Sequence, residues 1–278
     1  MRIAFLGPEG TFSEEALLAS RGASDFEPVP LPTIYDVVLA VHEGRVERAL
    51  APIENSLEGS VSATLDSLAF ETDDVVIVGE LVHTVRHCLI ARVARPLEEI
   101  ETVVSHPQAS AQCARFVRDR LPRARVVAAS STAEAVRSVA ESDRPWAALG
   151  NRLSAEIYGA EILVADVEDV PENETRFIWL APAGTAIESH GPWKTSIVFW
   201  GAGAGAPGWL VRCLSEFAFR GVNLTNIESR PRKQRLGRYI FFADVEGRDA
   251  DEAVAGAIEA LRAQVDMLRV LGSYPAAG

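Results

Sequence analysis

The first two-thirds of the chain repeats one unit, a short apolar segment that runs into a polar loop and then into the start of a helix. Apolar segments of this kind lie at residues 2–7, 49–53, 103–104 and 147–150. Strands that alternate with helices form a layered α/β structure, and their neighbouring strands are expected to be parallel. In such sheets ligand-binding groups gather at the carboxyl ends of the strands, beside helix N-termini. The pattern therefore predicts both a fold class and the place of a functional site.

Residues with known capping preferences mark the helix boundaries. Residues 11–14, Thr-Phe-Ser-Glu, have capping-box spacing for a helix that runs to about Ser20. Pro107 suits the first turn of a helix that ends near Leu121. Further helices are expected at residues 60–70, 132–142 and 151–159.

The pattern changes after residues 182–193, which are rich in turn-forming residues and lack periodicity. A length of 278 residues is enough for about two domains, so a boundary is expected here. The expected elements beyond it are strand 195–200, helix 208–220, strand 223–228, strand 238–245, helix 251–264 and strand 267–271. This β-α-β-β-α-β order is typical of ferredoxin-like domains.

Two loops of this second region allow more than one interpretation. Residues 201–205, Gly-Ala-Gly-Ala-Gly, resemble a dinucleotide-binding loop, but Ala206 stands where a third glycine is needed and Pro207 follows. We therefore do not expect a nucleotide there. Residues 230–238 carry five positive charges, which suit either a solvated hairpin connection or an acceptor for acidic groups on the first domain or on a partner subunit.

Composition excludes several classes of function. The formal net charge is −12, and residues 194–278 contribute 11 basic and 9 acidic residues, so the excess of acid lies in the first part of the chain. A sequence-independent nucleic-acid binder would need a basic stripe instead. No run of apolar residues is long enough to span a membrane, and the N-terminus is typical of a first strand rather than of a signal peptide. The three cysteines are far apart and unpatterned, which favours a reduced, cytoplasmic location without disulfides.

Polar residues stand at the ends of the apolar segments, where each has a structural and a functional interpretation. Thr11 and Ser13 could cap a helix or bind an anion at its N-terminus. Asn55 and Ser105 occupy the same place in their own units, and Arg176 stands at the mouth of an apolar strand, where it could pair with acidic neighbours or bind a carboxylate. The histidines lack metal-ligand spacing, so no metal site is expected at His42, His83, His87, His106 or His190.

Four of these segments together resemble the motifs of the prephenate dehydratases, in both order and spacing. They are Gly7-Pro-Glu-Gly-Thr-Phe-Ser13, Pro52-Ile-Glu-Asn-Ser56, Ser105-His-Pro-Gln-Ala-x-x-Gln-Cys113 and Asn173-x-Thr-Arg-Phe177. The tail, with Pro207-Gly-Trp-Leu, Gly221-Val-Asn-Leu and Glu228-Ser-Arg-Pro231, resembles an ACT regulatory domain. The resemblance covers nearly the whole chain.

The resemblance implies an α/β protein with a two-lobed catalytic domain, similar to periplasmic binding proteins, followed by a ferredoxin-like ACT domain. The catalytic domain would span residues 1–181, with lobe 1 at about 1–78 and 166–181 and lobe 2 at about 79–165. Residues 182–193 would form a linker and residues 194–278 the ACT domain.

The implied reaction is the conversion of prephenate to phenylpyruvate in phenylalanine biosynthesis, with loss of carbon dioxide and water and without a cofactor. Carried over position by position, the catalytic residues would be Thr175, Glu54, Asn55, Ser105 and Gln112. Thr175 would hydrogen-bond the departing oxygen, and the two amides would donate without adding charge. Substrate binding would involve Thr11, Ser13, Ser56, Arg176 and Phe177.

The resemblance also implies feedback inhibition by phenylalanine in a homodimer or homotetramer. The effector site would comprise Gly208, Trp209, Leu210, Asn223, Leu224, Glu228, Ser229, Arg230 and Pro231. Trp209 departs from the family, whose members usually carry alanine there, and an indole could fill or narrow the pocket. Two alternatives remain open, namely an arogenate dehydratase of nearly identical chemistry and a non-catalytic amino-acid sensor.

Overall fold

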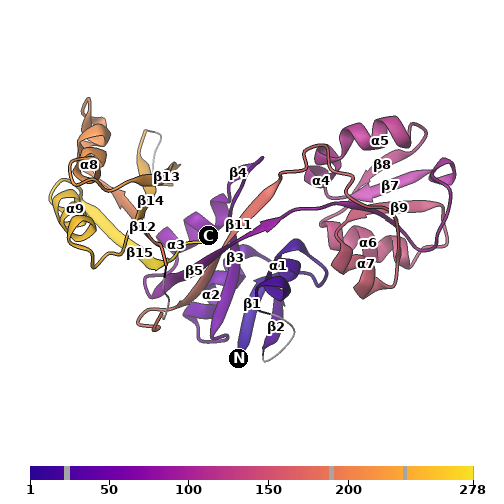
Figure 1. Cartoon of the computed structure of the whole chain (residues 1–278), viewed down its shortest axis with the longest axis horizontal. Helices are drawn as coiled ribbons and strands as arrows, with labels where there is room; N and C mark the ends of the chain where they lie inside the picture. The colour runs from indigo at the N-terminus through magenta and orange to yellow at the C-terminus, as the bar shows by residue number, and fades with distance from the viewer. Residues whose placement is uncertain (22–25, 188–190, 234–236, 278) are drawn as a thin grey trace. The chain divides into compact units, whose positions relative to one another are not determined.

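The computed structural model describes residues 1–21, 26–187, 191–233 and 237–277. The chain divides into two compact units, whose helices and strands are labelled in Figure 1. Unit 1 comprises residues 1–37, 55–59 and 83–175, and unit 2 comprises residues 38–54, 60–82 and 176–278. No helix in the described part of the chain is long and apolar enough to cross a membrane.

Unit 1 is built on a sheet with the strand order β10-β6-β9-β7-β8 and on a parallel pair formed by β1 and β2. Its strands are β1 (Arg2–Leu6), β2 (Glu27–Leu31), β6 (Cys88–Ala91), β7 (Thr102–Ser105), β8 (Arg125–Ala128), β9 (Trp146–Gly150) and β10 (Glu161–Val164). Its helices are α1 (Phe12–Arg21), η1 (Leu97–Glu99), α4 (Pro107–Gln112), α5 (Ala114–Arg120), α6 (Thr132–Ala140) and α7 (Arg152–Tyr158). The helix α2 (Ile34–His42) and the short strand β4 (Gly59–Ser60) run from unit 1 into unit 2.

The expectation of parallel pairing is correct for part of this sheet only. β7 is parallel to β8 and to β9, but β6 is antiparallel to both β9 and β10. β6 follows the preceding strand after only three residues, 85–87, without a helix between them. The strand–helix repeat that makes neighbouring strands parallel is therefore interrupted at this point.

Capping residues begin and end most helices where the sequence predicts. Ser131 accepts a hydrogen bond from the Glu134 amide, and Gly159 ends α7 in the left-handed conformation at φ 63°. The expected single helix from Pro107 to Leu121 is instead two helices, because Cys113 leaves the helical region at φ −115° and ψ 17°. The break leaves Gln112 as the last residue of α4.

Both faces of the β6-β9-β7 sheet are covered by apolar side chains. Leu89, Val103 and Leu149 pack with the α4–α5 segment, whereas Cys88, Ile90 and Val104 pack with α6 and α7. This alternation is the period of two expected for a strand buried on both sides. All three cysteines of the chain are buried and free.

Unit 2 contains strands in the order β3-β11-β5 and a second sheet in the order β13-β14-β12-β15. The elements of the first group are β3 (Arg48–Asn55), α3 (Ser62–Phe70), β5 (Val75–Thr84) and β11 (Glu174–Pro182). The second group, here called the C-terminal module, comprises β12 (Trp193–Trp200), η2 (Ala202–Gly205), α8 (Trp209–Ala218), β13 (Leu224–Pro231), β14 (Tyr239–Glu246), α9 (Glu252–Arg262) and β15 (Met267–Pro275). Its order β-α-β-β-α-β agrees with the sequence prediction.

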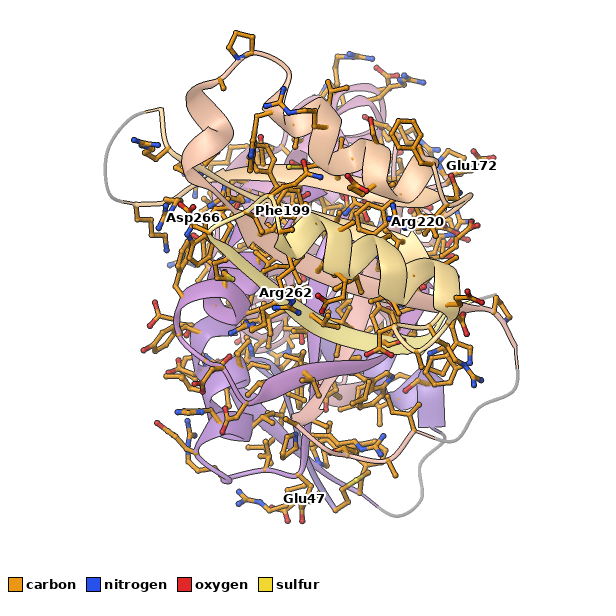
Figure 2. The ribbon with its side chains drawn as sticks, turned by 90° about the vertical axis from the view of Figure 1, so that its left-hand side faces the viewer. Glu47, Glu172, Phe199, Arg220, Arg262 and Asp266 are labelled. Carbon is orange, nitrogen blue, oxygen red and sulfur yellow. The ribbon has the colours of Figure 1, made fainter. Side chains whose placement is uncertain are left out.

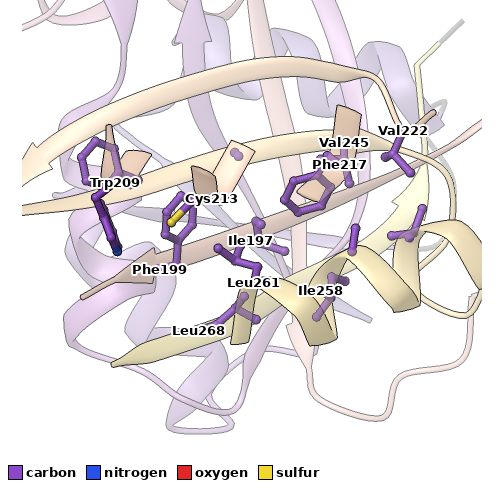
Figure 3. Packing of buried hydrophobic residues seen from close by; sticks show 14 residues of the cluster. Ile197, Phe199, Trp209, Cys213, Phe217, Val222, Val245, Ile258, Leu261 and Leu268 are labelled. Carbon is purple, nitrogen blue, oxygen red and sulfur yellow. The ribbon is translucent and has the colours of Figure 1, made fainter. Parts of the chain in front are cut away.

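Helices α8 and α9 lie side by side on one face of the C-terminal module's sheet (Figure 2). Between them and the sheet lies a core that includes Ile197, Phe199 and Phe217 (Figure 3). Trp209 belongs to this core, since it is 5% exposed, packs against Phe199 and Phe241, and donates from Nε1 to the Gln264 carbonyl at 3.2 Å.

The glycine-rich loop 201–205 makes room for this tryptophan. A Cβ atom on Gly203 would lie 2.2 Å from Cδ1 of the Trp209 indole, and one on Gly201 would lie 2.9 Å from its Cζ2. Gly201 and Gly203 therefore have a packing role, because a larger residue at either position would collide with Trp209.

We expect Trp209→Ala to lower the free energy of unfolding by about 3–5 kcal/mol, because it removes a buried indole and leaves a cavity in the C-terminal module. Urea denaturation measures this change. Val93→Ala is the control, because Val93 is 50% exposed and its truncation removes little buried surface. Equal, small effects of the two substitutions would contradict the burial of Trp209.

Basic residues attach the C-terminal module to helix α3. Arg230 donates to both carboxylate oxygens of Asp66 at 3.3 and 3.2 Å, and Lys233 lies 2.9 Å from the same group. Burial opposes the charge on Asp66, yet these hydrogen bonds hold the pKa of its carboxyl below the usual value. Arg269 on β15 donates to the carbonyls of Leu68 and Thr72. The contacts of Arg230 and Lys233 favour the interpretation in which the basic loop binds acidic groups. Residues 234–236 of the loop lie outside the described part of the chain.

Candidate functional site

The start of β11 and the end of β3 meet through the side chain of Asn55. Asn55 is 9% exposed, and its Oδ1 accepts hydrogen bonds from the amides of Leu57 and Glu58 at 3.0 and 3.1 Å. These two backbone donors fix the orientation of the amide, because only an oxygen can accept them. Nδ2 therefore points to β11, where it donates to Thr175 Oγ1 at 2.9 Å and to the Glu174 carbonyl at 3.1 Å.

A second amide, Asn173, extends this arrangement towards helix α4. Asn173 is 1% exposed, its Oδ1 accepts from Asn55 Nδ2 at 2.8 Å, and its Nδ2 donates to Gln112 Oε1 at 3.1 Å. Ser56 supports the same contact, since its hydroxyl lies 3.4 Å from Asn173 Oδ1 and accepts from the Glu174 amide at 3.0 Å. Four residues that the sequence singled out, Asn55, Ser56, Gln112 and Thr175, thus belong to one hydrogen-bonded network.

The far end of the network is the imidazole of His87. Its Nε2 lies 3.0 Å from Gln112 Oε1, while Gln112 Nε2 faces Glu58 Oε1 at 3.4 Å. Because a carboxylate can only accept, the Gln112 amide nitrogen must face Glu58, and its oxygen must face the ring. His87 Nε2 therefore carries the proton. Burial lowers the pKa of His87, so the ring is neutral at pH 7.

The directions of these bonds leave Thr175 with a defined task. Its oxygen accepts from Asn55, so its own proton is directed to another acceptor. Thr175 is half-buried, whereas Asn55 and Asn173 are buried. A hydroxyl that accepts from a buried amide can donate to a ligand atom, which suits an oxygen on which negative charge develops.

The N-terminus of α1 lies beside this network, since the Phe12 ring meets the His87 ring edge-on at 5.1 Å. Thr11 is used as a cap, because its hydroxyl donates to the Leu6 carbonyl at 2.8 Å and accepts from the Glu14 amide at 3.4 Å. Glu14 Oε2 accepts from the Gly10 amide at 2.5 Å, and burial raises the pKa of this carboxyl. An anion at this end of the helix would therefore compete with Glu14. Ser13 is 6% exposed.

Ser105 lies outside the network. It is fully buried in β7, and its hydroxyl donates to the Leu149 carbonyl of the neighbouring strand β9 at 2.9 Å. The side chain that caps α4 is that of His106, the next residue.

Arg176, the next residue after Thr175, lies among three carboxylates of unit 2. Its nitrogens approach Asp244 at 2.8 Å, Glu80 at 3.1 Å and Glu54 at 3.3 Å. Lys194 also pairs with Glu80, at 2.7 Å. Burial alone would lower the pKa of Arg176, but Asp244 and Glu80 raise it above its ordinary value. We call these five residues the Arg176 cluster.

The Arg176 cluster is continuous with the sheet of the C-terminal module. Ser196 on β12 donates to Asp244 Oδ1 at 2.5 Å, and its oxygen lies 2.7 Å from the hydroxyl of Tyr274 on β15. Tyr274 is fully buried, which raises the pKa of its phenol. Asp244 on β14 therefore holds the Arg176 guanidinium, and Ser196 and Tyr274 on the two other strands support Asp244. Phe177 is 2% exposed and belongs to the core.

The residues of the expected effector site have different surroundings. Trp209 is buried in the module, Arg230 is bound to Asp66, and Asn223 Nδ2 donates to Glu246 Oε1 at 3.1 Å. Gly208 precedes α8 with φ 74°, a conformation that favours glycine. The remaining members are Leu210 and Leu224, which are partly buried against the module core, and Glu228, Ser229 and Pro231 on the edge strand β13.

Sequence reasoning missed two members of the network. The fourth motif contains Asn173 without indicating a role for it, and the spacing of His87 addresses metal binding alone. The sequence does give one indication for His87, which directly precedes the buried apolar strand β6. A polar side chain buried there needs a hydrogen-bond partner. No group of three or more side chains suited to a metal ion occurs among the residues that the structure describes.

Comparison with known proteins gives a consistent result. Residues 3–185 match the family model described as prephenate dehydratase. A prephenate dehydratase from Amycolatopsis methanolica is 41% identical over 98% of this chain and 88% of its own length. A solved prephenate dehydratase from Arthrobacter aurescens, in complex with L-Phe, is 38% identical, covers 99% of this chain and 90% of its own, and superposes with a TM-score of 0.90.

A further solved structure, described as a novel type of quorum-quenching acylase, is 31% identical with a TM-score of 0.88 and covers 100% of this chain and 98% of its own. The family model spans well over half of the chain, and the Amycolatopsis methanolica relative is similar along nearly all of it. The chain belongs to the prephenate dehydratase family.

Proposed function

We propose that Thr175 donates the hydrogen bond that helps the hydroxyl group leave when this chain, a lyase, converts prephenate to phenylpyruvate. In this reaction the bond between the ring and its carboxylate breaks, its electron pair moves through the ring, and the C4–O bond breaks. With one proton taken up, the products are phenylpyruvate, carbon dioxide and water. Aromatisation supplies the driving force, so the protein has to orient the substrate and assist the departing oxygen.

The bond from Asn55 Nδ2 to Thr175 Oγ1 is the observation that carries this proposal. A threonine hydroxyl is too weak an acid to give up its proton outright. It can, however, donate a hydrogen bond that strengthens as negative charge grows on the leaving oxygen, and only such an interaction raises the turnover rate. Because Asn55 occupies the acceptor side of the hydroxyl, the donor side is directed to the substrate.

Neutral amides suit this site because the substrate carries two carboxylates. The amides of Asn55, Asn173 and Gln112 orient the Thr175 hydroxyl and carry no charge. A positive charge there would stabilise the bound substrate and the transition state equally, which would not raise the turnover rate. For one substrate carboxylate we propose the N-terminus of α1, with Ser13, where the carboxylate would displace Glu14 from the Gly10 amide. We assign supporting roles to Ser56, which accepts from the Glu174 amide, to Glu54, which pairs with Arg176, and to Ser105, which donates to the Leu149 carbonyl.

We also propose that residues 194–278 are an ACT regulatory domain with a ferredoxin-like fold, linked by residues 182–193 to a two-lobed catalytic domain at 1–181. The complex of the Arthrobacter aurescens relative with L-Phe supports phenylalanine as the inhibitor. The Arg176 cluster supports a route from effector to active site, because it holds the residue next to Thr175 against the C-terminal module. Couplings of this kind are worth about 1–3 kcal/mol. Initial rates at increasing phenylalanine concentration test the proposal.

A homodimer or homotetramer is proposed for the assembly. Val211 in α8 and Phe219 directly after it are 67% and 82% exposed, on the side of the helix opposite the buried residues Trp209, Cys213 and Phe217. A second copy of the chain would cover them. Sedimentation velocity with the wild type and with Phe219→Glu tests this, and a monomeric wild type would contradict it.

Turnover of prephenate by the purified chain tests the proposed function. Phenylpyruvate is followed by its enol absorbance in alkali, and arogenate in place of prephenate would give phenylalanine instead. An assay for phenylalanine tests arogenate as the alternative substrate. An assay for release of an acyl group tests the activity named for the similar acylase structure. Absence of turnover with prephenate, together with phenylalanine binding, would favour a sensor and contradict the proposal.

A further inference from the structure

His87 is a buried histidine that has no role in the reaction proposed for Thr175. Its ring is 2% exposed and lies between Phe12 on α1 and Gln112 at the end of α4. Its backbone amide donates to Glu168 Oε2 at 2.9 Å, and the same carboxylate pairs with Arg86 at 2.7 Å. Among the described residues no hydrogen bond joins the ring to Thr175, so any influence of His87 on Thr175 passes through Gln112.

Packing alone does not favour a histidine at this position. Nε2 carries the proton and donates to Gln112, which leaves Nδ1 as an acceptor, and no donor reaches Nδ1 among the described residues. A buried acceptor without a donor is unfavourable, and an apolar side chain of similar size would avoid it. The Nε2–H group must therefore supply something that an apolar side chain cannot.

That contribution is the orientation of an amide chain. Gln112 Oε1 accepts from both His87 Nε2 and Asn173 Nδ2, at 3.0 and 3.1 Å. Two donors on this oxygen oppose a flip of the amide, since a flip would bring three nitrogens together and turn the oxygen towards Glu58. The fixed Gln112 oxygen holds the Asn173 nitrogen, and so the Asn173 oxygen remains available to Asn55.

We propose that His87 is a positioning residue that orients Thr175 through Gln112, Asn173 and Asn55. The inference rests on the proposed function of Thr175. In this proposal His87 fixes the orientation of the Thr175 hydroxyl without touching it, because three side chains lie between them in the network.

The test compares two substitutions of His87. His87→Leu removes the donor, and we expect kcat to fall about 10- to 100-fold with little change in KM, as for other losses of alignment. His87→Gln places an amide N–H near the position of Nε2 and is expected to restore most of the lost kcat. His42→Leu is the control, because His42 is an exposed histidine that pairs with Asp74.

Three results would overturn the proposal. They are wild-type kcat in His87→Leu, equal losses in the leucine and glutamine variants, and additive losses when His87→Leu is combined with Gln112→Ala. The expected result for the double variant is no loss beyond that of Gln112→Ala alone, since His87 acts through that residue.

A measurement on the wild type keeps the proposal testable if His87→Leu does not fold. The ¹⁵N chemical shifts of the His87 ring are expected to show a neutral imidazole protonated at Nε2, and a ring protonated at Nδ1 would overturn the inference. This result does not depend on turnover. An inactive wild type with the expected tautomer would count against the proposed function only, whereas an active wild type with the other tautomer would count against His87 only.

Discussion

Thr175→Ala is expected to lower kcat for prephenate by at least about 100-fold while KM changes only a few-fold. The substitution removes the hydroxyl that contacts the departing oxygen, and this contact strengthens in the transition state. It leaves Asn55 with its bonds to Asn173 and to the Glu174 carbonyl, so the loop keeps its supports. Steady-state kinetics with prephenate measure both constants.

Thr175→Ser and Thr185→Ala are the matched controls. Serine keeps the hydroxyl and should retain most of the activity. Thr185 is a threonine whose hydroxyl donates to the Pro182 carbonyl in an exposed turn, and its loss should leave kcat unchanged. Near-normal turnover in a folded Thr175→Ala protein would exclude the hydroxyl from the chemistry.

Arg176→Met is expected to lower the free energy of unfolding by about 3–5 kcal/mol. The substitution leaves Glu54, Glu80 and Asp244 around an uncharged side chain, and of these three carboxylates Glu80 keeps an ion pair with Lys194. Removal of one partner from a buried ion pair is costly because the remaining charges are desolvated and unpaired. Urea denaturation followed by tryptophan fluorescence measures the loss.

The control is Arg92→Met. Arg92 forms an ion pair with Asp143, which is 94% exposed, and such surface pairs contribute about 0–1 kcal/mol. If Arg176 instead served only to bind a substrate carboxylate, Arg176→Met would raise KM. Its unfolding free energy would then change as little as that of Arg92→Met. The two measurements therefore separate a structural role from a substrate-binding role.

The sequence predicts the elements that carry local signals. The capping residues Ser131, Asn151 and Gly159 act where their types suggest, and the C-terminal β-α-β-β-α-β order follows from the hydrophobic pattern. The motifs also indicate Asn55, Gln112 and Thr175, which prove to be members of one network. Each of these inferences depends on residues close together in the chain or on motifs with fixed spacing.

The contacts that could not be predicted join residues far apart in the chain. The bond from Asn55 to Thr175 spans 120 residues, and the contact of Arg176 with Asp244 joins β11 to the C-terminal module. Spacing does not show which of many acidic residues an arginine meets. The antiparallel course of β6 and the break at Cys113 have the same origin, since each depends on tertiary packing rather than on local preference.

A double-mutant cycle on kcat, with Asn55→Ala, Thr175→Ala and the double variant, tests most directly whether Asn55 orients the Thr175 hydroxyl for reaction. If it does, Asn55→Ala lowers kcat in the wild type but changes it little once Thr175 is alanine, because the hydroxyl that it orients is already absent. Losses that add in the double variant would mean that the two residues act independently, and this would contradict the account.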